Sequence, residues 1–313
     1  MEKPLVSIAT LTYNHVDFID EFFESLLSQT YTNWEVVIGD DCSQDGTQDK
    51  LKYYQEKYSK QVKLILNKKN VGITKNSQNV IDHCSGKYMC TIAGDDLLLP
   101  TKLEKQVAIM ETNENVNMAY HDLEVFYEDG SPSVNFSKIN SFTPHRGTIK
   151  EMILYGAFAG ACSIMLRRSA LPKDGFDFRI PIASDWLFFV QSVGSGEFVY
   201  IDEILGKYRR HSSNVTTTMN EKALDDHIVS CSVLLCNYPE LSKIINKRLS
   251  YVLFEKAVMN LKIQDFSKFR DNLNASIETS MNKKNTLLLL LDKIGLADFD
   301  KLSKIKNKIK KSL

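Results

Sequence analysis

The sequence predicts an α/β domain with a mostly parallel central sheet, followed by a helical segment. Three observations predict this class. Short apolar segments alternate with segments of helical periodicity over the first hundred residues, acidic pairs follow two of the apolar segments, and the strand-like pattern stops near residue 220. Repeated βα units of this length imply parallel strands joined by right-handed crossovers. We therefore expect a domain over residues 1–218 and a helical region over residues 219–313.

The first hundred residues contain four predicted strands with helices between them. Residues 5–11 are short and mostly apolar, which is typical of a strand covered on both faces. In residues 16–27 apolar side chains recur at helical spacing. The alternation continues with strands at 34–38, 62–66 and 87–92 and helices at 47–58 and 73–83. Pro100 is expected to open the next helix, because proline is favoured in a first turn.

The middle of the chain is less regular. Its pattern predicts strands over 118–127 and 162–167, a short helix over 184–193, and a strand followed by a loop over 198–209. After residue 220 the composition changes to segments rich in Leu, Ile and Lys without a strand pattern, which predicts helices.

Composition excludes several classes of protein. The 313 residues are 43% hydrophobic and 25% charged, and Lys+Arg and Asp+Glu both number 39, so no global field favours nucleic acid. The start lacks the features of a secretion signal, and the longest apolar run, 287–291, is far shorter than the roughly 20 residues that span a bilayer. The six cysteines show no metal-ligand spacing, so we expect reduced thiols in a cytoplasmic protein.

Two pairs of aspartates lie where predicted strands end. Ligands of parallel sheets bind beyond the carboxyl ends of the strands, so we expect Asp40–Asp41 and Asp95–Asp96 to face one site. Two carboxylates on a tight loop can hold a hard divalent cation, which in turn binds phosphates. The alternatives are a solvated acidic turn for Asp95–Asp96 and a turn or helix cap for Asp40–Asp41. Tyr13 follows the first strand and suits either stacking on a base or closing the core.

An ordered set of motifs resembles the inverting family-2 glycosyltransferases. The resemblance covers residues 4–110 strongly and extends more weakly to about 215. It is carried by SIATLTYN at 7–14, SQTY at 28–31, WEVVIGDDCS at 34–43, DGT at 45–47, NVGI at 70–73, SGKY at 85–88 and GDD at 94–96. It implies a GT-A fold that binds a nucleoside diphosphate sugar.

The same resemblance implies roles for individual residues. Tyr13 and Asp41 would hold the uracil and ribose, Asp95 would lie near the ribose or sugar, and Asp96 would bind Mn²⁺ or Mg²⁺. A few further residues of the matching motifs are assigned to the nucleotide-sugar site: Thr12, Asn14, Asp40 and Gly72. One departure is visible at 76–79, which reads NSQN where many relatives carry an Arg–Asn or Asn–Arg pair. Lys75 is the candidate replacement for the missing cation.

Two later segments complete the predicted site. Asp185 opens a short helix among apolar neighbours, where partial burial would raise a carboxylate's pKa toward values useful for a general base. Its alternative role is a helix N-cap, which Ser184 could also supply. In YRRHSSN at 208–214, His211 is expected to ligate the metal or contact the diphosphate, and Arg209 or Arg210 to neutralise phosphate charge. A structural hydrogen-bonding role is the alternative for His211. His121–Asp122 is given a weak acceptor-binding role.

The predicted function is inverting transfer of a sugar from a UDP-sugar to a saccharide or lipid-diphosphate-linked saccharide in surface-polysaccharide biosynthesis, such as O-antigen or capsule. The alternatives are a sugar-1-phosphate nucleotidyltransferase, whose Gly-rich loop is missing after the first strand, and a non-catalytic carbohydrate-binding or scaffold protein. At the C-terminus, apolar residues recur among lysines: Leu302, Ile305, Ile309 and Leu313. Such a tail either lies on an anionic membrane, which would make the protein peripheral on the inner face, or packs on its own domain.

Overall fold

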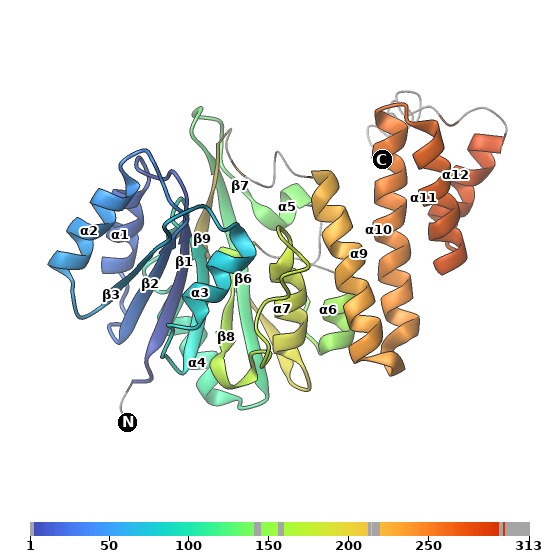
Figure 1. Ribbon diagram of the computed structural model, residues 1–313. Helices are drawn as coiled ribbons and strands as arrows, with labels where there is room; N and C mark the ends of the chain where they lie inside the picture. The colour runs from blue at the N-terminus through green and yellow to red at the C-terminus, as the bar shows by residue number, and fades with distance from the viewer. Residues whose placement is uncertain are drawn as a thin grey trace. The chain divides into compact units, whose positions relative to one another are not determined.

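The chain forms two compact units in a computed structural model, with the division between Thr217 and Thr218 (Figure 1). The structure describes residues 3–140, 145–155, 160–211, 214, 220–293 and 297. The first unit contains the sheet, and the second is helical.

One half of the sheet is parallel and carries the motifs. Its strands are β1 (Val6–Thr12), β2 (Trp34–Asp40), β3 (Val62–Leu66) and β4 (Tyr88–Ala93), arranged side by side in the order β3-β2-β1-β4. The registers pair Thr12 with Asp40 and Leu11 with Ala93, so the three strands β1, β2 and β4 end at one edge. The four strands predicted for this half are all present.

The other half of the sheet is mixed. Strand β8 (Met165–Arg167) lies antiparallel between β4 and β6 (Val116–Tyr127), and β6 runs parallel to β9 (Glu197–Arg210). Two short strands, β5 (Leu97–Leu98) and β7 (Val134–Asn135), pair antiparallel with β9 and β6. The loop predicted after the strand at 198 is absent, because β9 continues to Arg210 along β6. The strand predicted over 162–167 is shorter, because a 3₁₀ turn occupies Ala161–Ser163.

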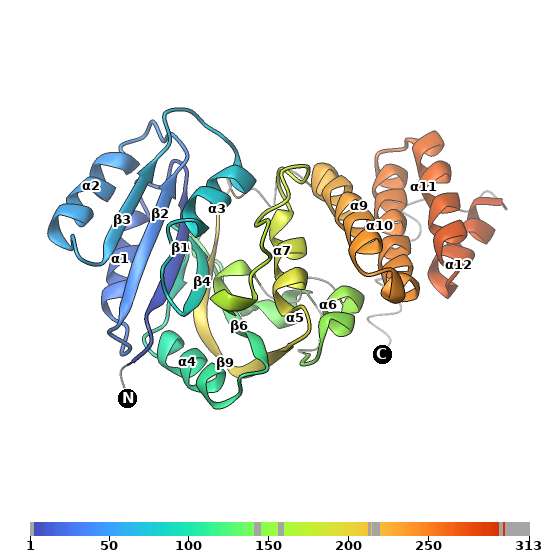
Figure 2. The same cartoon turned by 60° about the horizontal axis from the view of Figure 1, so that its bottom comes forward.

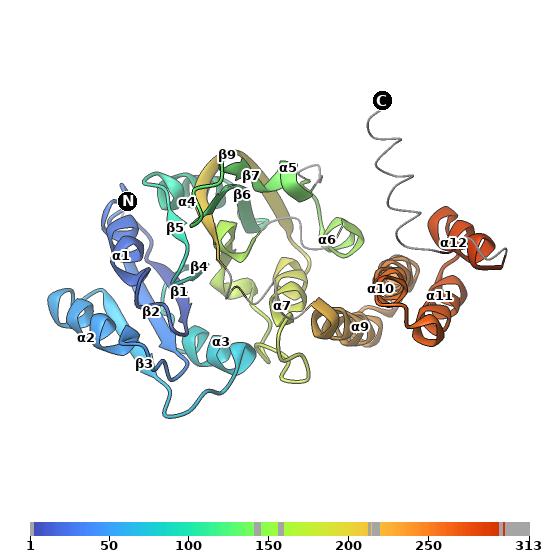
Figure 3. The same ribbon diagram turned by 90° about the horizontal axis from the view of Figure 1, so that it is seen from above.

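Helices cover both faces of the parallel strands. They are α1 (Ile19–Leu27), α2 (Thr47–Lys57) and α3 (Ile73–Ile81), and Figure 3 shows α1 and α3 on opposite sides of β1 and β2. The apolar face of α1 buries Ile19, Phe22, Phe23 and Leu26, and each such side chain contributes about 1.5–3 kcal/mol through its removal from water. Phe23 also stacks on Tyr54 of α2, with ring centroids 3.8 Å apart.

Two predicted helix starts differ from the observed ones. Helix α1 begins at Ile19 rather than residue 16, and the backbone N–H groups of His15 and Val16, in the turn before it, donate to Thr47 Oγ1 and Asp45. Pro100 precedes α4 (Lys102–Thr112) by two residues. The remaining helices of this unit are α5 (Phe136–Asn140), α6 (Ile149–Tyr155) and α7 (Ser184–Val193), and α7 agrees with its prediction. Figure 2 shows α7 beside α3.

The second unit contains four α-helices among the residues described, with a 3₁₀ helix at Pro239–Leu241 between the first two. They are α9 (Asn220–Asn237), α10 (Ser242–Lys262), α11 (Phe266–Thr279) and α12 (Lys283–Lys293). Its core is formed by Ala257, Leu261, Phe269, Leu273 and Leu288. No single described helix is long and apolar enough to cross a bilayer; the helices over 221–237 and 239–262 reach that length and composition only as a pair bent by 116°. The amphipathic tail predicted over 302–313 lies outside the described residues.

Candidate active site

The carboxyl ends of β1, β2 and β4 bring the first predicted residues together. Thr12 and Asp40 are register partners, and the Thr12 hydroxyl donates to Asp40 Oδ2 at 3.1 Å. The N–H of Asp41 donates to Thr12 O, and that of Gly94 donates to Leu11 O. The loops that follow the three strands therefore begin side by side, as the strand pattern predicts.

Asp40 has a different place from the one predicted. Its side chain has no exposed surface, and it accepts hydrogen bonds from Thr12, from Gln48 Nε2 at 2.6 Å and from the amide and hydroxyl of Ser43. The predicted direct contact of Asp40 with a nucleotide is inconsistent with this environment, because its carboxylate is buried and bonds to the loop and helix that follow β2. Thr12 is likewise buried against Asp40. Asn14 has a left-handed φ of 55°, and its Oδ1 accepts from Gln44 N–H, so it too fixes this loop.

At this edge of the sheet the side chain of Tyr13 is exposed, whereas that of Asp41 is nearly buried. The Tyr13 side chain is 48% exposed and free to cover a planar ligand. Asp41 is nearly buried, and its carboxylate accepts from the N–H groups of Val71 and Gly72 at 2.8 and 2.9 Å and from Asn67 Nδ2 at 3.1 Å. Gly72 has a φ of 85°, which suits glycine, and is the N-cap of α3. Asp41 therefore joins the end of β2 to the start of α3.

The segment after Gly72 contains one exposed cation. Lys75 lies in the first turn of α3, is exposed, and makes no hydrogen bond or ion pair within the described part of the chain. Its neighbour Asn76 is buried, donates to Gly39 O at 2.8 Å and accepts from Asn67 at 2.9 Å. Asn76 is thus committed to the fold, whereas Lys75 can reach a ligand.

Asp95 lies in the turn after β4 and is paired with His211. His211 Nε2 is 2.9 Å from Asp95 Oδ2, His15 Nε2 is 4.0 Å from the same oxygen, and Asn214 Nδ2 lies 3.0 Å from His211 Nε2. Burial opposes ionisation of Asp95, but the hydrogen bond to His211 and the charge of His15 together outweigh it and lower the pKa of the carboxyl. The surroundings of Asp95 therefore favour its ionised form.

Arg209 is hydrogen-bonded to both members of the acidic pair, to the side chain of Asp96 and to the backbone of Asp95. Asp96 Oδ1 accepts the N–H of Arg209 at 2.9 Å, and Arg209 Nε donates to Asp95 O at 2.8 Å. Burial, reinforced by the charge of Asp95, raises the pKa of Asp96 well above its ordinary value. His211, which is predicted to ligate the metal together with Asp96, bonds to Asp95. The metal-binding role of Asp96 and His211 stays a prediction.

The phosphate-binding role predicted for Arg209 does not fit its surroundings. The residue is 6% exposed. Its guanidinium lies between the rings of Phe18 and Phe126, at 4.8 and 4.6 Å from their centroids, and pairs with Glu21 at 2.7 Å. These contacts make Arg209 a support for the acidic turn rather than a group that faces a ligand.

A divalent cation would find oxygen donors at this turn. Asp95 Oδ1 is buried and has no hydrogen-bond partner, so it is an acceptor that a cation could satisfy. Across the described ranges, no group of three His, Cys, Asp or Glu side chains is arranged to hold an ion. Mg²⁺ is usually held by one or two carboxylates together with substrate phosphates, so a complete protein shell is not required. The donors present thus fit an ion that binds with a diphosphate.

Asp185 is the second residue of α7. Its side chain is accessible to solvent, and its Oδ1 accepts the N–H of Trp186 at 2.8 Å. Desolvation by the surrounding protein atoms raises the pKa of the carboxyl, and the Trp186 hydrogen bond only partly opposes this. A carboxylate that is accessible and has a raised pKa can accept a proton from a substrate.

His121 and Asp122 lie inside the protein. His121 is 1% exposed and Asp122 is 7% exposed, and the latter accepts from the N–H and hydroxyl of Ser137. Their predicted role in binding an acceptor does not fit this burial. Sequence reasoning missed His15 and Asn214, which surround the Asp95–His211 pair. Asn214 belongs to the quoted segment 208–214, but nothing about the lone His15 indicates that it lies there.

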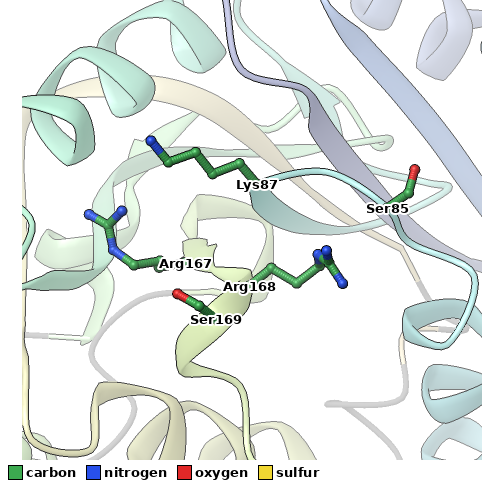
Figure 4. A pocket seen from close by; sticks show the side chains of 5 residues that line it. All are labelled: Ser85, Lys87, Arg167, Arg168 and Ser169. Atoms are coloured by element: carbon green, nitrogen blue, oxygen red, sulfur yellow. The ribbon is translucent and has the colours of Figure 1, made fainter.

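A basic pocket lies at the opposite end of β4 (Figure 4). It has a volume of about 460 Å³ and is lined by Ser85, Lys87, Arg167, Arg168 and Ser169. Lys87 pairs with Glu111 at 2.5 Å, and the Arg167 guanidinium donates to the carbonyls of Val116, Met110 and Asn113. Arg168 Nε donates to Gly86 O at 2.8 Å. Since all three cations are committed to the fold, this pocket is not the candidate site.

Comparison with known proteins identifies the family. The model of "Glycosyl transferase family 2" matches residues 7–173. The putative glycosyltransferase EpsE of Bacillus subtilis is 39% identical over 167 residues, covering 53% of this chain and 58% of its own length. The putative teichuronic acid biosynthesis glycosyltransferase TuaG of the same organism is 26% identical over 216 residues, covering 69% and 82%. An uncharacterised Mycobacterium tuberculosis protein matches over 60% of its length. The chain therefore spans about 60% of the length of this protein and of EpsE.

Solved structures share the fold. S. aureus TarS 1–349 in complex with UDP-GlcNAc has a TM-score of 0.67 at 16% identity, with 98% of this chain and 92% of that chain covered. The mannosyltransferase PcManGT of Pyrobaculum calidifontis, solved with GDP-Man and Mn²⁺, has a TM-score of 0.60 at 13% identity, with 94% and 81% covered. These likenesses confirm the predicted GT-A fold. With more than half of its residues matched by the family model, the chain belongs to glycosyl transferase family 2.

Proposed function

We propose that this chain transfers a sugar, with inversion of configuration, from a nucleoside diphosphate sugar to a saccharide or lipid-diphosphate-linked saccharide. The observation that carries the proposal is the meeting of Tyr13, Asp41 and the Asp95–His211 pair at the carboxyl ends of three adjacent strands. Parallel sheets bind nucleotides at this edge. TarS and PcManGT, which share the fold, were solved with UDP-GlcNAc and GDP-Man.

The nucleoside is proposed to bind between Tyr13 and Asp41. The exposed Tyr13 ring would stack on the base, and the oxygens of Asp41, already fixed by Val71 and Gly72, would accept hydrogen bonds from the base. Lys75 lies in the first turn of α3, three residues after the N-cap Gly72, where its ammonium would pair with a phosphate. We propose a UDP-sugar as the donor.

The diphosphate is proposed to bind at the turn after β4. Asp95 and Asp96 would hold Mn²⁺ or Mg²⁺, with His211 against Asp95, and a bound ion would neutralise charge on the departing diphosphate. Arg209 contributes by holding the acidic turn in place through Asp96 Oδ1 and Asp95 O.

Asp185 is proposed to activate the acceptor. Its carboxylate takes the proton of the acceptor hydroxyl as that oxygen forms a bond to the anomeric carbon. The bond from this carbon to the diphosphate oxygen breaks on the opposite face, and the nucleoside diphosphate leaves with the bonding electrons. One displacement inverts the configuration and needs no covalent enzyme intermediate.

We propose a surface polysaccharide as the setting of this reaction, with the protein in the cytoplasm at the inner face of the membrane. The name of TuaG, a putative teichuronic acid biosynthesis glycosyltransferase, supports this setting. The basic tail over residues 302–313 is proposed to contact anionic lipid.

A binding and turnover screen tests the proposal. Thermal shift and hydrolysis are measured for UDP- and GDP-sugars with and without Mn²⁺, on wild type and on Asp95→Asn and Asp185→Asn variants. We expect one nucleotide sugar to stabilise the wild type in a metal-dependent way. Asp95→Asn should lose this shift, while Asp185→Asn should bind but not turn over. Absence of binding by every nucleotide sugar would rule the transferase function out.

A further inference from the structure

A buried pair of hydroxyls connects helix α3 to helix α7. Thr74, in the first turn of α3, is 3% exposed, and Ser184, the first residue of α7, is 2% exposed. Their oxygens lie 2.8 Å apart, and Thr74 Oγ1 also donates to Ile180 O at 2.5 Å. Because a hydroxyl has a single proton, the proton between the two side chains belongs to Ser184, which donates to Thr74. Thr74 thus binds both the segment before α7 and the helix itself.

Asp41 binds the two residues that lead into the same turn of α3. The carboxylate accepts the N–H groups of Val71 and Gly72, and Thr74 follows Gly72 by two residues. Asp185 directly follows Ser184. Asp41, the proposed nucleoside-binding carboxylate, is therefore connected to the proposed base Asp185. The connection runs through its bond to Gly72, the first turn of α3 and the hydrogen bond between Thr74 and Ser184.

A second contact fixes the segment before α7 on α3. Gln78 Oε1 accepts the N–H of Phe176 at 2.7 Å. Gly175 has a φ of 66°, a conformation that favours glycine, and a Cβ there would lie 2.1 Å from Gln78 Oε1 and would displace the Gln78 amide. The segment over residues 175–184 therefore contacts α3 through two side chains, Gln78 and Thr74. Thr74 is the nearer of the two to Asp185 along the chain, because it bonds to Ser184.

We propose that Thr74 is a positioning residue for Asp185, which links the donor-binding loop at Asp41 and Gly72 to the base on α7. This inference rests on the proposed function. A donor that binds at Asp41 and Gly72 fixes the first turn of α3, and the Thr74–Ser184 hydrogen bond passes this order to the start of α7. Thr74 touches no reacting atom; its effect on the rate arises through the placement of the Asp185 carboxylate, for which small displacements have large effects.

The test compares three substitutions. Thr74→Val keeps the shape but removes the hydroxyl, and Thr74→Ser restores it. Ser77→Ala is the matched control, because Ser77 is also a mostly buried hydroxyl of α3, but it donates only to Ile73 O within the helix. Backbone hydrogen exchange over residues 184–188 is measured in the free proteins, followed by donor affinity and turnover with the UDP-sugar that binds best.

We expect exchange over 184–188 to become faster in Thr74→Val and to stay at the wild-type rate in Thr74→Ser and Ser77→Ala. Turnover of Thr74→Val should fall by about tenfold or more while its donor affinity stays within about threefold. The acidic limb of its pH–rate profile should shift, which a loss of stability alone would not cause. Thr74→Ser should recover turnover to within about twofold of wild type.

Unchanged exchange in Thr74→Val would overturn the inference, and so would equal losses of turnover in Thr74→Val and Ser77→Ala. A wild-type protein that binds no nucleotide sugar would instead overturn the proposed function, and the exchange comparison would still decide whether Thr74 orders the start of α7.

Discussion

His211 Nε2 and Asp95 Oδ2 lie 2.9 Å apart, which joins the end of β9 to the turn after β4. Both side chains are nearly buried, at 5% and 7% exposure. A buried charge keeps its ionised form only with partners of this kind, so the pair is the electrostatic centre of the candidate site.

Replacing His211 with Ala should destabilise the protein and impair the site together. The change leaves the Asp95 carboxylate with only the long Asn214 contact and the distant His15, and loss of one partner of a buried polar pair costs about 1–3 kcal/mol. Urea unfolding measures this loss, and metal-dependent binding of UDP should weaken in the same variant. A His211→Ala protein with wild-type stability would show that the pair is not formed.

Arg209 should prove to be a structural residue. Arg209→Met removes the pairing with Glu21 and the bond to Asp95 O while leaving an apolar side chain between Phe18 and Phe126. Because Glu21 is 55% exposed, the main loss is the buried bond to Asp95 O, and we expect a decrease of about 1–3 kcal/mol in the free energy of unfolding, measured by urea. Unchanged stability with a specific loss of donor affinity would contradict this and return Arg209 to its predicted phosphate-binding role.

Lys75, in contrast to Arg209, should contribute to donor binding and not to stability. Because its ammonium is exposed and uncommitted among the residues described, Lys75→Met should leave the melting temperature within about 2 °C and weaken donor binding about five- to tenfold. Lys60→Met, which removes an exposed charge elsewhere, is the control. Equal affinities of the two variants for a UDP-sugar, by titration calorimetry, would exclude Lys75 from the site.

Stability at low pH should depend on Glu35. This carboxylate is 5% exposed; burial opposes its ionisation, but bonds from Lys63, Ser7 and Ser85 outweigh this and lower its pKa to about 2. A folded-state pKa below the unfolded one contributes stability that is present above the unfolded value of 4.5 and lost as pH falls toward 2. The contribution is about 3 kcal/mol.

Glu35→Gln should therefore lower stability at pH 7 and flatten its decline between pH 4.5 and 2. Urea unfolding at several pH values measures both effects. Glu56→Gln, at an exposed position, is the control and should keep the wild-type pH dependence. Identical pH profiles for wild type and Glu35→Gln would refute the assignment.

The proposed role of Asp185 as the base predicts that transfer slows at acidic pH. Desolvation raises the pKa of this carboxyl, so the acidic limb of kcat/KM should lie above the ordinary value of 3.8, and the rate should rise as the carboxylate loses its proton. Asp185→Asn should lose turnover by at least about a hundredfold and keep donor affinity. A pH–rate profile with no limb in the wild type would exclude this carboxylate as the base.

The sequence predicts the parallel half of the fold well and the mixed half less well. Apolar runs place β1, β2 and β4, because burial on both faces requires such runs, and acidic pairs mark the ends of β2 and β4. The insertion of β8 between β4 and β6 could not be predicted, since a three-residue strand carries no pattern that sets its partner. The continuation of β9 to Arg210 depends on pairing with β6, which is a long-range contact.

Within the site, the sequence indicates the right segments but not which side chains face a ligand. Asp40, the last residue of β2, accepts a hydrogen bond from Gln48, in the helix that follows the strand. Only Asp41, the next residue, bonds to the start of α3. Arg209 is basic and lies in a matching motif, yet two aromatic rings distant in sequence enclose it. Thr74 belongs to none of the motifs quoted above. Its hydrogen-bond partner Ser184 is 110 residues away in the sequence, so no local pattern could indicate the contact on which its proposed role rests.

Calorimetric titration of UDP and GDP in the presence of Mn²⁺ shows whether the carboxyl ends of β1, β2 and β4 bind a nucleoside diphosphate. We expect one of them to bind the wild type with micromolar affinity and to bind Asp41→Asn at least about tenfold more weakly, with circular dichroism confirming that the variant is folded. If neither nucleotide binds the wild type, or if Asp41→Asn binds equally well, the nucleotide site does not lie at this edge of the sheet.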